Sequence, residues 1–89
     1  MNDLVKIRME FYGQFVGIIG KKDMCFEVEP ELEKAVGTIG RCLEMDYNIK
    51  IPYVLLLNDR LVSLIIKGGE NQSINSGDVF KFVPVLSGG

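Results

Sequence analysis

The feature that most constrains this chain is a change in the spacing of its apolar residues at Pro30. Before Pro30, residues 4–12 and 24–29 alternate apolar and polar side chains, which is typical of strands with one buried face. After Pro30 the spacing becomes that of a helix face, with apolar residues at Leu32, Val36, Ile39 and Leu43. The sequence therefore predicts two strands followed by a helix.

The connection between the first two strands contains three glycines, Gly13, Gly17 and Gly20. Two alternating runs joined by a glycine-bearing loop predict a hairpin. The string GIIGKK within this loop superficially resembles a phosphate-binding loop, but that motif needs a glycine at Phe15 and Ser or Thr at Lys22. A hairpin turn is the better interpretation.

Three further strands are expected after the helix. Residues 52–59 are almost continuously apolar, which favours a central strand. Asn58-Asp59 marks a turn, and a short strand is expected in RLVSLI beyond it. Residues 79–83 form the expected last strand, with Phe80 and Phe82 in the core and with Val79 and Val83 on the opposite face.

Two glycines interrupt the predicted helix, Gly37 and Gly40. Each weakens a helix by about 1 kcal/mol relative to alanine. A tight approach of the helix to the sheet would explain them.

Composition excludes several classes of function. The 89 residues suffice for one domain, and the net charge of −2 comes from ten basic and twelve acidic residues that are mixed along the chain, without a basic stripe for nucleic acid. The apolar runs are too short to span a membrane. The first residues lack the form of a signal peptide, so we expect a cytoplasmic protein in which Cys25 and Cys42 are buried and reduced.

The chemistry of a self-contained enzyme is missing from the side chains. The chain has no histidine, so it has no imidazole base and no histidine-ligated metal. The two cysteines lie too far apart in sequence to make a zinc site, and no carboxylates are marked by their spacing as a catalytic pair. We therefore expect neither a metal nor a bound cofactor.

The chain resembles the ubiquitin-like β-grasp sulfur carriers, most of all the small subunit of molybdopterin synthase. The likeness is carried by KIRMEFYG at the first strand, by VLLLNDRLV, and above all by INSGDVFKFVPVLSGG. The last of these combines a Gly-Asp turn, an apolar strand, a proline and a final Gly-Gly. The chain departs from the family at Gln14, where a basic residue is usual, and at Asn58-Asp59, where Asn-Gly is commoner.

The resemblance implies an α+β, ubiquitin-like β-grasp fold with a mixed sheet of four to five strands on one main helix. Residues 1–84 would form the domain, and residues 85–89 a flexible tail. It also implies that an E1-like adenylating enzyme uses ATP to activate the carboxylate of Gly89, that sulfur converts it to a thiocarboxylate, and that the large subunit of molybdopterin synthase receives the sulfur. The chain would be a protein co-substrate rather than an enzyme.

The expected site residues lie on the last strand and the tail. Gly89 is the reactive residue, and Gly88 lacks a side chain, so both can enter a narrow channel. Pro84 has a fixed φ and no N–H, so it is expected to stay out of the ladder, end the strand and direct the tail away. The partner-binding residues are expected to be Val79, Val83, Pro84, Val85, Leu86 and Ser87.

Three alternatives remain open. The chain could carry sulfur for thiamin, tRNA or cysteine synthesis. It could be a ubiquitin-like modifier whose Gly89 forms isopeptide bonds with lysines. It could also be an interaction module with an inert tail.

Overall fold

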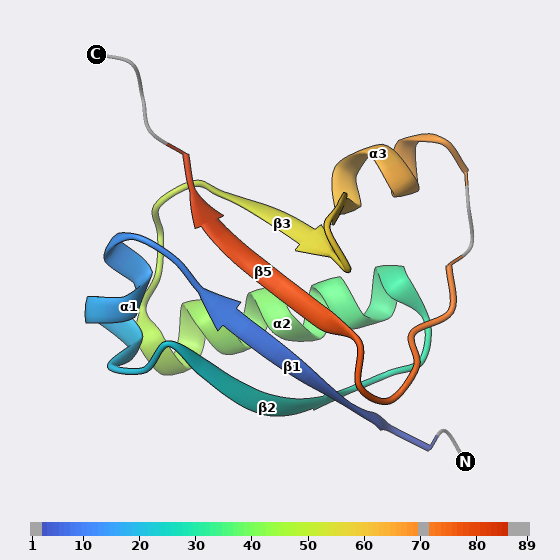
Figure 1. Ribbon diagram of the computed structural model, residues 1–89, viewed down its shortest axis with the longest axis horizontal. Coiled ribbons are helices and arrows are strands. Elements are labelled where there is room, and N and C mark those ends of the chain that lie inside the picture. Colours follow the sequence, from blue (N-terminus) through green and yellow to red (C-terminus); the bar gives the residue numbers. More distant parts are fainter. Residues whose placement is uncertain (1–2, 70–71, 86–89) are drawn as a thin grey trace.

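The computed structural model describes residues 3–69 and 72–85 of the chain. Within these residues the strands form one twisted sheet, and the longest helix crosses behind it in the view of Figure 1. The elements in chain order are β1 (Val5–Phe11), α1 (Gln14–Ile19), β2 (Asp23–Val28), α2 (Leu32–Tyr47), β3 (Tyr53–Leu57), β4 (Arg60–Leu61), α3 (Val62–Lys67) and β5 (Val79–Pro84).

The sheet is mixed, with the strand order β2-β1-β5-β3-β4. β1 pairs antiparallel with β2 and parallel with β5, and β5 pairs antiparallel with β3. The expected α+β class, with a mixed sheet packed on one main helix, is confirmed. The expectation of a central third strand is wrong, because β5 takes the centre and β3 lies between β5 and the two-residue β4.

The core fills the space between the sheet and α2. Phe80 and Phe82 of β5 are both 0% exposed, which confirms the predicted inward face of that strand. α2 contributes Leu32, Ala35, Ile39 and Leu43, so the predicted helix face is shifted only slightly, with Val36 at its margin. Phe26 of β2 is only partly buried and packs against the margin of the core.

The loop between β1 and β2 is not a simple turn, because it contains the helix α1. Phe15 and Ile19 are buried at the two ends of this helix, and their spacing of four residues places both on one helix face. The three glycines obscured this short apolar period in the sequence. Gly20 ends α1 in the left-handed conformation, with φ +83°, which glycine adopts without steric cost.

The stretch after Asp59 also differs from the expected strand. β4 ends at Leu61, and α3 begins at Val62. Val62 and Ile65 are buried, and their spacing of three residues is a helical one. Six residues hold too few turns for the two periods to be told apart by sequence alone.

A network of hydrogen bonds joins the β3–β4 turn to the start of β5. The Asn58 side chain donates to Asp78 Oδ1 over 3.2 Å and accepts from the Val79 backbone N–H over 3.0 Å. Asp78 Oδ2 accepts from the Asn75 N–H over 2.9 Å, while Gly77 turns the chain with φ +91°. The Gly-Asp pair, Gly77 and Asp78, contributed to the sequence resemblance. In the structure it holds the first residue of β5 in position.

Pro84 is the last residue of β5, in register with Tyr53 of β3. The Val85 N–H donates to the Pro52 carbonyl over 3.3 Å, so the ladder to β3 continues past the proline. Because successive N–H groups alternate in direction, the missing N–H of Pro84 falls on the β1 side, where pairing has already ended at Phe11. The expectation that Pro84 stays out of the ladder is therefore wrong, although the strand does end there.

The two cysteines lie outside the core, contrary to their expected burial. Cys25 is exposed and Cys42 is half-buried, and both thiols are free. Cys25 occupies an outward position of β2, because Met24 and Phe26 on either side of it pack against the core. Over residues 3–69 and 72–85, the helices are too short or too polar to cross a membrane.

The glycines of α2 do not mark a tight approach to the sheet. A methyl group on Gly37 would meet only the Arg41 side chain, at 3.7 Å, and one on Gly40 would lie 4.0 Å from the Tyr53 hydroxyl oxygen. Both are ordinary contact distances. Gly13 is the opposite case, because its φ is +58° and a Cβ there would lie 2.8 Å from Pro84 Cγ.

Replacing Gly37 with alanine should stabilise the protein. The backbone is helical and the added methyl group has room, so the gain should approach about 1 kcal/mol in the free energy of unfolding. Urea or thermal unfolding measures it. A loss of stability would show that Gly37 packs more closely than the structure indicates.

Replacing Gly13 with alanine should destabilise the protein by about 2–3 kcal/mol, because the new Cβ meets the Pro84 ring and the backbone conformation is strained for alanine. Gly20→Ala is the control: its φ is also positive, in the left-handed helical region, and a Cβ there has no neighbour within 4 Å. The control should cost only about 1–2 kcal/mol. Equal losses for the two variants would show that the Pro84 contact is unimportant.

Candidate functional site

The sheet leaves one side uncovered, and half of that side is apolar. Helix α2 covers the inward side, so the outward side chains of β5, β3 and β4 face solvent. The register brings Val83 beside Val54, and Leu56 beside Leu61. We call the resulting surface the apolar face, and its members are Val54, Leu56, Leu61, Val79, Val83 and Val85.

Sequence reasoning found only part of the apolar face. Val79 and Val83 were predicted to lie opposite the two phenylalanines of β5, and the structure places them there, half-buried. Val54, Leu56 and Leu61 were missed. The signal was present in the continuous apolar run of β3, but a central strand would have explained that run equally well.

The root of the tail lies at the edge of the apolar face. β5 passes from Val83 through Pro84 to Val85, whose side chain is exposed. The Gly13 backbone approaches Pro84 from the α1 side, and the Pro52 carbonyl binds the Val85 N–H from the β3 side. The chain at Pro84 and Val85 is therefore held from both sides. Four predicted site residues lie outside the described residues, namely Leu86, Ser87, Gly88 and Gly89.

The other half of the uncovered side, on β1 and β2, is polar and largely paired with itself. Arg8 Nη2 donates to Asp23 Oδ2 over 3.0 Å, and its Nε lies 3.4 Å from Glu10 Oε2. The Tyr12 hydroxyl donates to Glu10 Oε1 over 2.9 Å, and this hydrogen bond raises the pKa of Tyr12 above its ordinary value. Arg8 thus holds both acids in place.

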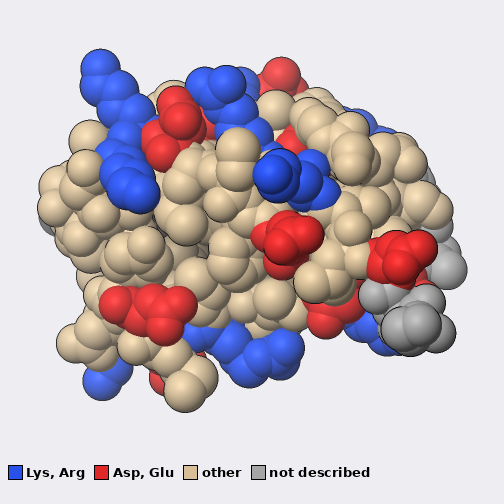
Figure 2. Space-filling model, turned by 90° about the horizontal axis from the view of Figure 1, so that it is seen from below, with Lys and Arg blue, Asp and Glu red and all other residues tan. Residues whose placement is uncertain are grey.

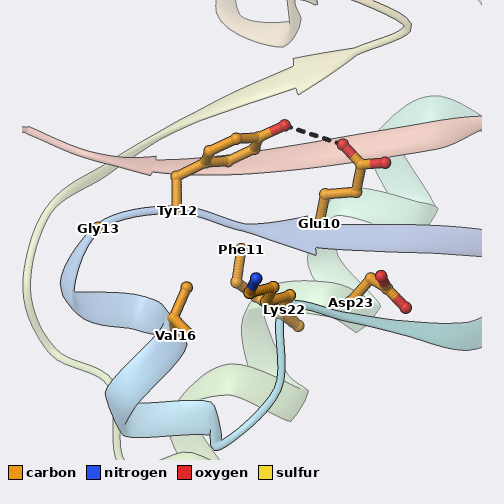
Figure 3. Close-up of a pocket in the computed structure, with 7 residues that line it drawn as sticks. All are labelled: Glu10, Phe11, Tyr12, Gly13, Val16, Lys22 and Asp23. Carbon is orange, nitrogen blue, oxygen red and sulfur yellow. Dashed lines mark hydrogen bonds between the residues drawn. The ribbon is translucent and has the colours of Figure 1, made fainter.

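A hollow of about 350 Å³ lies between the end of β1, α1 and the start of β2. Figure 3 shows Glu10 and Tyr12 hydrogen-bonded to each other above it, with Lys22 and Asp23 on its other side. Among the described residues, the acids that line this hollow are Glu10 and Asp23, and both already pair with Arg8. The hollow therefore does not present a free acid–base pair.

Lys81 is the one charged residue among the outward positions of β5. Its ammonium nitrogen lies 2.6 Å from Asp59 Oδ1 in the β3–β4 turn. Elsewhere the charges are mixed: Figure 2 shows lysines and arginines interspersed with acids on the side seen from below. Within the described part of the chain, histidine, cysteine and acidic side chains form no group of three that could hold a metal.

The arrangement suits the docking of a partner protein. It offers an uncovered apolar face, a polar border on which Arg8 pairs with Glu10 and Asp23, and the end of β5 beside that face. A partner protein that covers the apolar face would stand next to Val85, just past the end of β5.

Several solved structures share this fold. The Haloferax volcanii HVO 2177 protein matches with a TM-score of 0.68 at 20% identity, over 97% of this chain and 88% of its own. Small archaeal modifier protein 1 from Methanosarcina acetivorans matches with a TM-score of 0.65 at 11% identity, over 98% and 99%. A complex of subunits 1 and 2 of molybdopterin-converting factor from Helicobacter pylori matches with a TM-score of 0.57 at 18% identity, over 96% and 100%.

No protein-family model matches the chain, and no curated protein matches it. The likeness therefore rests on the arrangement of the elements: a β1–β2 hairpin, a crossing helix, and a central β5 that pairs parallel with β1. The chain has the ubiquitin-like β-grasp fold of these neighbours.

Proposed function

We propose that this chain is a protein sulfur carrier that serves as the small subunit of a molybdopterin synthase. An E1-like enzyme transfers AMP from ATP to the carboxylate of Gly89 and releases pyrophosphate. A sulfide sulfur then attacks the carbonyl carbon, AMP leaves, and a thiocarboxylate remains. The large subunit of the synthase takes that sulfur to build the pterin that holds molybdenum or tungsten. The chain is a co-substrate, and it binds no cofactor of its own.

The observation that carries the proposal is the continuity between the apolar face and the tail. Val79 and Val83 lie on the same strand that leads through Pro84 into the tail. An extended tail from Val85 to Gly89 spans roughly 17 Å, at about 3.4 Å per residue. A partner docked on the apolar face can therefore bind the end of the tail deep inside its own structure, while the domain stays on the partner's surface.

The chemistry of the chain supports a passive role. The sequence contains no histidine, and the acids Glu10 and Asp23 are held by Arg8. Acyl activation needs a nucleotide site and general acid–base groups, which the activating enzyme supplies. The Helicobacter pylori neighbour is a complex of two subunits of molybdopterin-converting factor, which favours a large-subunit partner for this chain.

A protein modifier is the second candidate, favoured by the likeness to small archaeal modifier protein 1. Both functions begin with adenylation of Gly89, but they differ in the acceptor of the activated carbonyl. Intact mass spectrometry of the protein from its native cells separates them. An oxygen-to-sulfur exchange at the C-terminus supports the carrier, and conjugates to lysines support the modifier.

Deleting Gly89, or adding one alanine after it, should abolish thiocarboxylate formation while leaving the fold intact. The tail lies beyond β5, and the reaction requires a carboxylate at one fixed reach from the docked domain. Thiocarboxylate formation is followed by mass, and thermal unfolding provides the control. A normal rate of sulfur loading in either variant would contradict the carrier mechanism.

Val83→Asp should weaken binding to both the activating enzyme and the large subunit, because an unpaired charge in a desolvated contact costs several kcal/mol. Cys25→Asp is the matched control, since it puts the same charge on an exposed outward position of β2, away from the apolar face. Calorimetric titration measures both affinities. Loss for one partner only would mean that the two partners bind different faces of the domain.

A further inference from the structure

Lys81 stands at the border between the apolar face and the polar half of the sheet, on the same strand as Val79 and Val83. The register puts Leu56 on one side of it and Glu10 on the other, and Val79 and Val83 precede and follow it on the outward side of β5. A partner that buries these apolar neighbours must also bury part of Lys81. An unpaired buried charge opposes binding strongly, so the ammonium group needs a partner of its own.

Asp59 supplies that partner from within the chain. The Lys81 ammonium nitrogen lies 2.6 Å from Asp59 Oδ1, and this pairing raises the pKa of Lys81. Glu10, directly across from Lys81 on β1, is engaged by Tyr12 and Arg8 instead. Since β3 runs antiparallel to β5, the Asp59 turn draws the ammonium group toward the start of β5 and away from Pro84 and the root of the tail.

The backbone conformation at Asp59 favours glycine over the aspartate that occupies the position. Asn58 and Asp59 form a two-residue turn with φ of +48° and +70°, and the second position of such a turn favours glycine. A non-glycine residue with positive φ is strained unless another interaction holds it. Exposed ion pairs contribute little to folding stability, and the Asp59 side chain is 74% exposed, so stability of the free domain does not account for it.

We propose that Asp59 is a positioning residue for partner recognition: it holds Lys81 at the border of the apolar face and neutralises it, so that the face accepts an apolar partner surface with no acid opposite Lys81. The proposal rests on the proposed function, because it takes the apolar face as the docking surface of the activating enzyme. It goes further by stating the chemistry of the partner surface. The region opposite Val83, Leu56 and Lys81 is apolar and uncharged.

The decisive variant is Asp59→Gly, because it should move stability and binding in opposite directions. Glycine suits the turn, so the thermal midpoint should stay the same or rise. Loss of the carboxylate leaves Lys81 unpaired, so the dissociation constant for the activating enzyme should increase by about tenfold or more. A merely structural role for Asp59 would lower stability and binding together.

Lys81→Met in the Asp59→Gly background should restore binding, because it removes the unpaired charge and keeps most of the length of the side chain. Asp23→Asn is the control: it removes an acid from another ion pair of the sheet surface, the one with Arg8, outside the apolar face, and should leave affinity unchanged. Tighter binding or unchanged binding of Asp59→Gly would overturn the proposal. Tighter binding would mean that the partner carries its own acid opposite Lys81.

NMR of the free domain tests the same inference without any partner. In the wild type, Lys81 side-chain protons should show contacts to the Asp59 turn, and in Asp59→Gly they should gain contacts to the methyl groups of Leu56 and Val83. An identical pattern in both proteins would overturn the proposal. If the purified activating enzyme does not adenylate the wild type, the proposed function fails, and the NMR comparison still decides whether Asp59 positions Lys81.

Discussion

The structure depends on β5, which is paired on both sides and carries the two most deeply buried aromatic residues of the sheet. Phe80 and Phe82 pack against the core that α2 closes, and the Phe82 ring lies 5.5 Å from the rings of both Phe11 and Tyr53. Burial of such rings is among the largest single contributions to the stability of a small domain. Because the outward residues of the same strand form part of the apolar face, the position of that face is fixed by the core.

The regular elements with a long, clean period were predictable from sequence. Alternation of apolar residues predicted β1 and β5, and helical spacing predicted α2. The predicted buried faces of these three elements agree with the structure. The elements that were predicted incorrectly are the short ones. α1 and α3 have six residues each, and their helical conformation depends on packing of Phe15 and Ile65 rather than on local preference. Tertiary contacts determine whether such short segments are helical, and these contacts cannot be inferred from a single sequence.

The only residues of the candidate site that could be predicted from sequence are those that lie on a single strand, β5. Val79 and Val83 follow from alternation within β5, but Val54 and Leu61 join them only because β3 and β4 lie next to β5 in the sheet. Strand order is a global property, and the apolar run of β3 fits a buried strand and a half-covered one equally well. The role of Asp59 was hidden for a similar reason, since nothing in the sequence marks its pairing with Lys81 from another strand.

The parallel pairing of β1 with β5 has a consequence for how the chain reaches its folded state. Arg8 pairs with Val79, so the centre of the sheet joins the first strand to the last. Contacts of such large sequence separation form slowly, because the entropy of closing a long loop is lost before they form. During synthesis the β1–β2 hairpin and α2 would emerge with the middle of the sheet still missing. The native domain can form only after β5 has left the ribosome.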